Sequence, residues 1–208
     1  GSYEPMAAAG LVIEAATERE DIKRKIFEDV GKVLGHQAVL ASNTSSIPIT
    51  RMAQATPDPS RFIGVHFFNP VPVMGLIEVI RGLATSDDAV EKVRHFGEAL
   101  GKTMVFANDS PGFIVNRIAR PFYAETLALL LEQAATPQVL DACMKAAGFR
   151  MGPCELMDLI GHDTNFSVTN SVYEANFHDK RYVPSLVQRE MVAGGLLGRK
   201  NGRGFYRY

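Results

Sequence analysis

Two titratable residues occur in apolar stretches of the sequence, where a charged side chain needs a partner. His66 lies near the end of the apolar stretch 62–67, and Glu78 interrupts the apolar run 76–80. A carboxylate that binds one imidazole nitrogen fixes the tautomer and makes the other nitrogen more basic. Such a pair would serve as a general base. The local sequence leaves two alternatives open: a core histidine bonded to the backbone, and a glutamate on the solvent face of an edge strand.

Other polar side chains could bind a substrate beside such a base. Ser45 lies in the polar segment 42–46, which lacks the Gly-x-Ser-x-Gly turn of a serine hydrolase and is also typical of a helix-capping loop. Asn116 follows a Pro-Gly turn and is equally compatible with a solvent-facing position. The segment 198–204 combines glycines with cations, which suits phosphate contacts; a solvated flexible terminus is the alternative. No metal site is predicted, because ligand-like spacing is lacking around His36, His95, His162 and His178.

The elements that must position these residues alternate in the first half of the chain. Short apolar runs predict strands at residues 11–14, 38–41, 62–67, 76–80 and 103–107. Helical spacing of apolar residues predicts helices at 19–34, 47–55 and 87–100. This alternation is typical of an α/β layer with a mostly parallel sheet, and we expect the strand 11–14 to be buried on both faces. Such sheets bind ligands at the carboxyl ends of their strands, which would gather Glu14, Glu18, segment 42–46, His66 and Asn69.

The sequence changes character at the turn 108–112, which is rich in Asn, Asp, Ser, Pro and Gly. Helical patterns follow at 113–133, with a proline inside, at 136–147, from 152 onward, at 163–176 and at 185–193. Strand signals are almost absent from this half. The sequence therefore predicts two domains, an α/β domain at 1–108 and an all-helical domain at 109–208.

Composition and charge exclude several classes of protein. The chain has 208 residues, of which 46% are hydrophobic and 22% charged, and its formal net charge is -1. A near-neutral chain argues against a protein that coats nucleic acid. No apolar run approaches the roughly 18 residues of a membrane span, and no signal peptide is recognisable at the start. The two cysteines form no CxxC pair. We therefore expect a cytoplasmic protein with reduced thiols and with neither a nucleic-acid nor a membrane partner.

Four strings of residues, in the same order along the chain, resemble the 3-hydroxyacyl-CoA dehydrogenase family. They are ASNTSS at 41–46, HFFNPVP at 66–72, DSPGFIVNR at 109–117 and GPCELMD at 152–158. The ending GRGFY at 202–206 is similar as well, so the resemblance covers almost the whole chain. The stretch 149–165 is most similar to the bacterial 3-hydroxybutyryl-CoA and 3-hydroxyadipyl-CoA members of the family.

The resemblance implies a Rossmann-like NAD-binding domain followed by an all-α domain that binds substrate and forms a homodimer. It also implies NAD-dependent oxidation of an (S)-3-hydroxyacyl-CoA to the 3-ketoacyl-CoA, in β-oxidation of fatty acids or in butanoate or phenylacetate breakdown. His66 would be the base and Glu78 its orienting partner, while Ser45 and Asn116 would hydrogen-bond the substrate oxygen. The positions that match cofactor-lining residues of the family are Glu18, Lys23, Ser45, Asn69 and Lys200.

One departure from the family concerns the phosphate-binding segment. The family begins with a strand, a Gly-rich turn and a helix that hold the pyrophosphate, and no Gly-x-Gly-x-x-Gly motif occurs in this sequence. We therefore expect an N-terminally truncated Rossmann-like domain that lacks its first βαβ unit, and a chain that binds NAD poorly by itself. Two other readings remain open: a non-catalytic dimerisation fragment and, less well supported, a hydrolase that uses Ser45.

Overall fold

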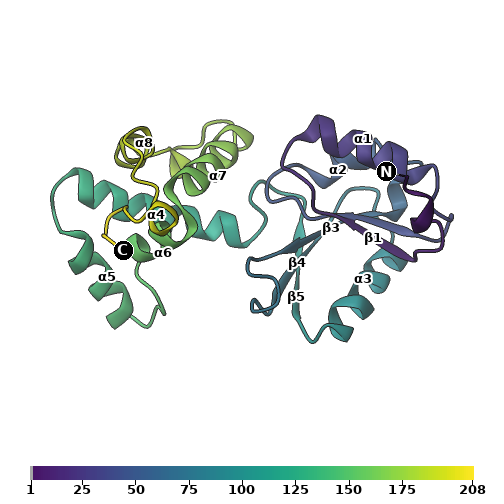
Figure 1. Cartoon of the computed structure of the whole chain (residues 1–208), viewed down its shortest axis with the longest axis horizontal. Coiled ribbons are helices and arrows are strands. Elements are labelled where there is room, and N and C mark those ends of the chain that lie inside the picture. Colours follow the sequence, from purple (N-terminus) through teal and green to yellow (C-terminus); the bar gives the residue numbers. More distant parts are fainter. Residues whose placement is uncertain (1) are drawn as a thin grey trace. The chain divides into compact units, whose positions relative to one another are not determined.

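The computed structural model describes residues 2–208 and divides into two compact units, Gly1–Ile114 and Val115–Tyr208. Figure 1 shows the first as a sheet with helices on it and the second as an assembly of helices. Both fold classes are those predicted from the sequence. The assignment of substrate binding and dimerisation to residues 109–208 remains a prediction.

The first unit is built on one five-stranded sheet whose strands follow the chain order. The strands are β1 (Leu11–Glu14), β2 (Val39–Ser42), β3 (Phe62–Phe67), β4 (Leu76–Arg81) and β5 (Thr103–Asn108). Three of the four pairings are parallel, and β3 pairs with β4 antiparallel. The loop 68–75 explains this exception, because a parallel pairing needs a crossover connection longer than eight residues. The prediction of a mostly parallel sheet is confirmed.

Helices cover both faces of this sheet (Figure 1). They are α1 (Glu20–Gly31), α2 (Ile49–Ala53) and α3 (Asp87–Ala99), with short 3-10 helices at Glu4–Met6 and Pro59–Arg61. Successive residues of β3 enter opposite cores: Phe62 packs in the cluster that contains Phe27 of α1, and Ile63 packs in the cluster that contains Val90 of α3. This alternation, which follows from the two-residue period of a strand, buries both faces of the central strands.

The strand β1 differs from the prediction that it is buried on both faces. Leu11, Val12 and Ile13 are only partly buried, and among the described residues β1 pairs with β2 alone. Within the described residues β1 has one neighbour instead of two, which accounts for its partial burial; the apolar run identified the strand itself.

The second unit contains five α-helices: α4 (Val115–Leu131), α5 (Pro137–Ala146), α6 (Pro153–Ile160), α7 (His162–Ala175) and α8 (Leu186–Ala193). Short 3-10 helices lie at Lys180–Tyr182 and Arg199–Asn201. Tyr123, Leu127, Cys154 and Met157 form its buried apolar core. No strand occurs among the described residues of this unit, which confirms the all-helical prediction. In the same described chain, no helix is long and apolar enough to cross a membrane.

The basic, glycine-rich tail is bound to the helices by a buried carboxylate. Asp158, which is completely buried in α6, accepts the backbone N–H groups of Phe205 and Tyr206, each at 2.9 Å. It also accepts the hydroxyl of Tyr208 at 3.0 Å. The residues that directly follow the segment 198–204 are therefore bound to α6, and Lys200 within it forms an ion pair with Asp163, which argues against the interpretation of that segment as a solvated flexible terminus.

Candidate active site

His66 and Glu78 lie opposite each other in the sheet. They are a directly paired couple in the antiparallel register of β3 and β4, so that their side chains share one face. The His66 Nδ1 atom is 2.7 Å from the Glu78 Oε2 atom, and both side chains are buried. Glu78 is fully enclosed on β4, which has a neighbour on each side, so the alternative of a solvent-facing glutamate on an edge strand is wrong.

The hydrogen bonds around this pair fix the tautomer of the histidine. An ionised carboxylate only accepts hydrogen bonds, so Nδ1 of His66 carries the proton and Nε2 keeps its lone pair. The hydroxyl of Ser45 lies 3.0 Å from Nε2 and can donate to it. The other carboxylate oxygen of Glu78 accepts the backbone N–H of Ile114 at 2.9 Å. His66 is therefore held in the form that a general base requires, with its free lone pair turned toward a hydroxyl group.

Glu18 organises the loop that carries Ser45. Its Oε1 atom accepts the backbone N–H groups of Ser45 and Ser46 at 2.9 and 3.0 Å, and the hydroxyls of Thr44 and Ser46 at 2.8 and 3.0 Å. The Thr44 hydroxyl in turn accepts the N–H of Ile47 at 3.0 Å. The loop after β2 is thus preorganised by one carboxylate, which fixes the backbone of Ser45 next to His66.

Lys23 forms a buried ion pair at the carboxyl end of β1. It is 1% exposed, and its Nζ atom lies 2.6 Å from Glu14 and 3.9 Å from the partly exposed Glu18. Ser42 donates its hydroxyl to the same Glu14 oxygen at 2.9 Å, and the N–H of Ala16 donates to the other at 2.7 Å. A buried ammonium needs such a partner, so Lys23 both neutralises Glu14 and joins α1 to the sheet.

Asn69 lies in the exposed loop after β3, at the same edge of the sheet as Glu18, Ser45 and His66. A neighbouring amide, which the sequence reasoning missed, has a clear structural role. The side-chain oxygen of Asn43 accepts the N–H of Phe67 at 2.8 Å and so ties the ends of β2 and β3 together.

The remaining predicted residues belong to the second unit. Asn116 is half-buried in the first turn of α4. Lys200 lies in the tail and forms an ion pair with Asp163 in the first turn of α7. Burial, the largest single effect, opposes ionisation of Asp163, but the hydrogen bond and the charge of Lys200 together with backbone N–H hydrogen bonds outweigh it and lower the pKa of this carboxyl. The ion pair with Asp163 therefore holds the ammonium group of Lys200 at the start of α7.

The sequence reasoning also missed two buried carboxylates in this unit. Asp141 accepts the backbone N–H groups of Cys154 and Glu155 at 2.8 and 3.0 Å, at the start of α6. Asp158 accepts Nε2–H of the completely buried His162 at 2.7 Å. The spacing of Asp158 and His162, four residues apart, was a usable signal. Within residues 2–208, no three His, Cys, Asp or Glu side chains gather as a metal site.

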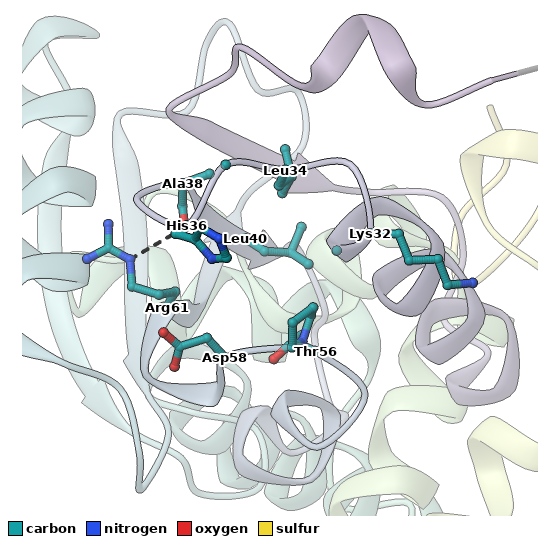
Figure 2. A pocket seen from close by; sticks show the side chains of 11 residues that line it. Lys32, Leu34, His36, Ala38, Leu40, Thr56, Asp58 and Arg61 are labelled. Atoms are coloured by element: carbon teal, nitrogen blue, oxygen red, sulfur yellow. Dashed lines mark hydrogen bonds between the residues drawn. The ribbon is translucent and has the colours of Figure 1, made fainter.

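A separate pocket of about 290 Å³ lies at the opposite, amino-terminal ends of β2 and β3 (Figure 2). Leu34, His36, Leu40, Asp58 and Arg61 line it, and Arg61 donates to the carbonyl of Ala38. None of the candidate site residues is among its lining residues, so this pocket is distinct from the His66 site.

The comparison with protein families assigns both halves of the chain. Residues 1–110 match the model described as 3-hydroxyacyl-CoA dehydrogenase, NAD binding domain, and residues 112–208 match the C-terminal domain of the same enzyme. The chain belongs to the 3-hydroxyacyl-CoA dehydrogenase family. The predictions of this family, of an NAD-dependent dehydrogenase and of NAD as the cofactor are confirmed at the level of the family.

Individual 3-hydroxyacyl-CoA dehydrogenases agree with this assignment. The chain is 51% identical to the 3-hydroxyadipyl-CoA dehydrogenase of Escherichia coli K12, over 97% of this chain and 42% of that protein. It is 47% identical to the 3-hydroxybutyryl-CoA dehydrogenase of Bradyrhizobium diazoefficiens, over 99% of this chain and 70% of that protein. The crystal structure of (S)-3-hydroxybutyryl-CoA dehydrogenase from Ralstonia eutropha superposes with a TM-score of 0.95 at 47% identity, covering 100% of this chain and 73% of that one.

The residues of this 3-hydroxyacyl-CoA dehydrogenase domain fit one end of an NAD molecule. Carboxylates, hydroxyls and amides gather at the carboxyl ends of β1, β2 and β3, and these groups suit ribose hydroxyls and the nicotinamide carboxamide. A diphosphate instead calls for glycine-rich backbone at a helix start, and the 208 residues contain no Gly-x-Gly-x-x-Gly motif. The donor set therefore fits the nicotinamide end of the cofactor.

Proposed function

We propose that the protein carrying this chain oxidises the 3-hydroxyl group of (S)-3-hydroxyacyl-CoA thioesters to the ketone, with NAD as the electron acceptor. The observation that carries this proposal is the line of hydrogen bonds from Ser45 through His66 to Glu78, at the ligand-binding edge of the sheet. A base that faces a hydroxyl group is the chemistry that alcohol oxidation requires.

In the proposed reaction the 3-hydroxyl proton moves to Nε2 of His66 while the hydride leaves carbon 3. NAD, when bound, supplies the acceptor for that hydride. The products are then the ketone, NADH and a protonated imidazole. Glu78 stabilises this imidazolium through its 2.7 Å contact with Nδ1, as the carboxylate of a catalytic triad does.

Ser45 has to change its partner during this cycle. In the structure its hydroxyl faces the Nε2 lone pair of His66 at 3.0 Å. That single lone pair can accept a hydrogen bond from only one hydroxyl group at a time. When the substrate hydroxyl donates to Nε2, the Ser45 hydroxyl turns and donates to the substrate oxygen. We assign Asn116 as a second donor to this oxygen, and we assign Glu18, Lys23, Ser45, Asn69 and Lys200 to the cofactor side, as in the family.

We also propose that residues 109–208 mediate a homodimer and that the protein acts in the cytoplasm, in the breakdown of fatty acids or related acids. The number of apolar side chains exposed on this unit supports the dimer; they include Ile118, Leu131, Val139 and Phe149. Size-exclusion chromatography with light scattering tests it, because the proposal requires twice the chain mass.

The exchange His66→Gln tests the function. The rate of acetoacetyl-CoA-dependent NADH oxidation should fall about 10²- to 10⁴-fold, the contribution expected from general acid–base catalysis. The control is His95→Gln, which changes an exposed histidine of α3 and should leave the rate unchanged. An unchanged rate in His66→Gln would contradict the assigned mechanism, and an inactive wild-type protein that still dimerises would favour the non-catalytic alternative.

A further inference from the structure

The segment 109–114, which directly precedes α4, contains an unusual backbone conformation. Phe113 has a φ angle of +48°, and Gly112 before it has +77°. An aromatic residue rarely adopts this left-handed region, because the conformation costs free energy. The other described residues of this kind that are not glycine are exposed and lie just after α4 and α7, where helices commonly end in this way; they are Gln133, Phe177 and His178. Phe113 is instead 3% exposed and lies outside the helices, so its strain calls for another explanation.

Two successive residues of this segment contact the two members of the His66–Glu78 pair. The ring of Phe113 packs edge-to-face against the imidazole of His66, with 5.7 Å between the ring centres and an angle of 63° between the planes. The N–H of the next residue, Ile114, donates to Oε1 of Glu78 at 2.9 Å. The left-handed backbone of Phe113 lies between this ring and this N–H group, so it determines that both contacts form at once.

Hydrogen bonds hold both ends of the segment. Asp109 accepts the first two N–H groups of α2 at 2.8 and 2.7 Å, one on each carboxylate oxygen. Within the turn, the N–H of Phe113 donates to the carbonyl of Ser110 at 2.9 Å. At the other end, Ile114 is bonded to Glu78. These bonds over-determine the backbone around Phe113, which is the condition under which a strained conformation persists.

The imidazole of His66 needs a second constraint, because one hydrogen bond fixes only one atom of its ring. The bond to Glu78 holds Nδ1, and the ring plane could still tilt about this contact. Two aromatic rings restrict the tilt: Phe113, and Phe68, whose ring centre lies 4.7 Å away at an interplanar angle of 61°. Edge-to-face contacts at such distances are favourable and directional. The direction of Nε2, which faces the Ser45 hydroxyl at 3.0 Å, therefore depends on these rings as well as on Glu78.

We propose that Phe113 is a positioning residue for the base: its ring, held by the strained backbone of the segment 109–114, fixes the plane of the His66 imidazole so that Nε2 points at the substrate hydroxyl. This inference rests on the proposed function, in which His66 takes the proton of that hydroxyl. Phe113 acts through His66 and exchanges no proton itself. A misplacement of about 1 Å can cost about 100-fold in rate. Loss of the ring should therefore lower kcat and leave KM nearly unchanged, since the reacting geometry is altered more than substrate binding.

Two matched substitutions test this role in the full-length protein. Phe113→Leu replaces the aromatic ring by a smaller apolar side chain. Phe27→Leu makes the same exchange at a completely buried residue of the same core cluster, whose ring packs against Phe62 instead of His66. Both variants should lose stability. Only Phe113→Leu should lower kcat for acetoacetyl-CoA, by about 10- to 100-fold, with KM nearly unchanged.

Nitrogen-15 NMR of the histidines gives a second readout that needs no substrate, with the His66 signals assigned by their loss in His66→Gln. Wild-type His66 should show a single tautomer with its proton on Nδ1, and ring protons shifted by the neighbouring aromatic rings. In Phe113→Leu a part of this ring shift should be lost, and the Nδ1 proton should exchange faster with water. In Phe27→Leu both signatures should remain.

A folded Phe113→Leu variant with the wild-type kcat and an unchanged His66 spectrum would overturn the proposal. An equal loss of kcat in Phe27→Leu would overturn it as well, because any defect of this core would then slow the enzyme. If the wild type does not turn over acetoacetyl-CoA, the proposed function fails, while the spectra still show whether Phe113 orients the imidazole. Should Phe113→Leu fail to fold, Phe113→Met takes its place, since the flexible side chain of methionine fills irregular gaps in a core.

Discussion

The exchange Glu78→Gln changes one oxygen atom to an NH₂ group at the centre of the candidate site. Both carboxylate oxygens of Glu78 accept hydrogen bonds from groups that are themselves buried or partly buried: Nδ1–H of His66 at 2.7 Å and the N–H of Ile114 at 2.9 Å. A glutamine offers one acceptor and one donor in nearly the same volume. The two donors therefore compete for one oxygen, and the site has two ways to respond.

Each response has a different cost. If the amide oxygen faces His66, the NH₂ group meets the N–H of Ile114 and two buried donors are left unsatisfied, at about 1–3 kcal/mol. If the NH₂ group faces His66, the imidazole must change tautomer, so that Nδ1 accepts and Nε2 carries the proton. The proton on Nε2 then faces Ser45, and His66 has no lone pair with which to take the substrate proton. In both cases the negative charge that stabilises the imidazolium is lost, and we expect kcat to fall about 10²- to 10⁴-fold.

The assay is the initial rate of NADH oxidation with acetoacetyl-CoA, measured from pH 5.5 to 9 beside thermal unfolding of the same samples, a range that spans the usual titration of histidine. A residue that acts through His66 should change the shape of the pH–rate profile as well as the rate. Glu91→Gln is the matched control, since Glu91 is an exposed carboxylate of α3. A variant that loses only stability, with an unchanged kcat and pH profile in the folded state, would refute the reasoning and reduce Glu78 to a packing residue.

Two further predictions concern the second unit. Gly204→Ala should lower the free energy of unfolding by about 1–3 kcal/mol, because a Cβ atom there would lie 2.0 Å from the Oδ1 atom of Asp158. Urea unfolding measures this loss. The control is Gly75→Ala, since no atom lies within 4 Å of a Cβ atom at that position. Burial lowers the pKa of His162 below 6.5, although the hydrogen bond that its Nε2–H donates to Asp158 opposes the shift. The unfolded chain then binds more protons than the folded one, so stability is full above pH 6.5 and declines as the pH falls below it. His162→Gln should flatten this decline in the melting temperature, and an equally steep decline in the variant would contradict the assignment.

Much of the fold could be predicted because its local signals agree with one another. The strand β3 and the helix α3 begin where their apolar patterns begin, and Ser86 and Thr136 cap α3 and α5 as their residue types indicate. The partial burial of β1 among the described residues could not be predicted, because burial of a strand depends on which neighbours pair with it. An apolar run alone does not show how many neighbours a strand has.

The candidate site was predictable in part for a similar reason. His66 and Glu78 were recognisable as titratable residues in apolar runs, and the antiparallel register of β3 and β4 then places their side chains opposite each other on one face. The role of Glu18 as the acceptor that orders the Ser45 loop was not recognisable, since an acidic residue in a polar loop is unremarkable in sequence. Only the fold brings four donors of that loop to a single oxygen atom.

Arg120 is a cation within the apolar stripe of α4, a sequence signal that the interpretation of this helix did not use. Arg117 and Arg120 lie three residues apart on α4, yet the first is exposed and the second is 4% exposed. The difference follows from the stripe that Arg120 occupies, because Tyr123 and Leu127, three and seven residues later, are the buried apolar residues of the same helix face. A cation in such a stripe needs hydrogen-bond acceptors on a neighbouring helix. Arg120 finds them on α7, in the backbone carbonyl of Asn165 and the hydroxyl of Thr169, and these contacts join α4 to α7.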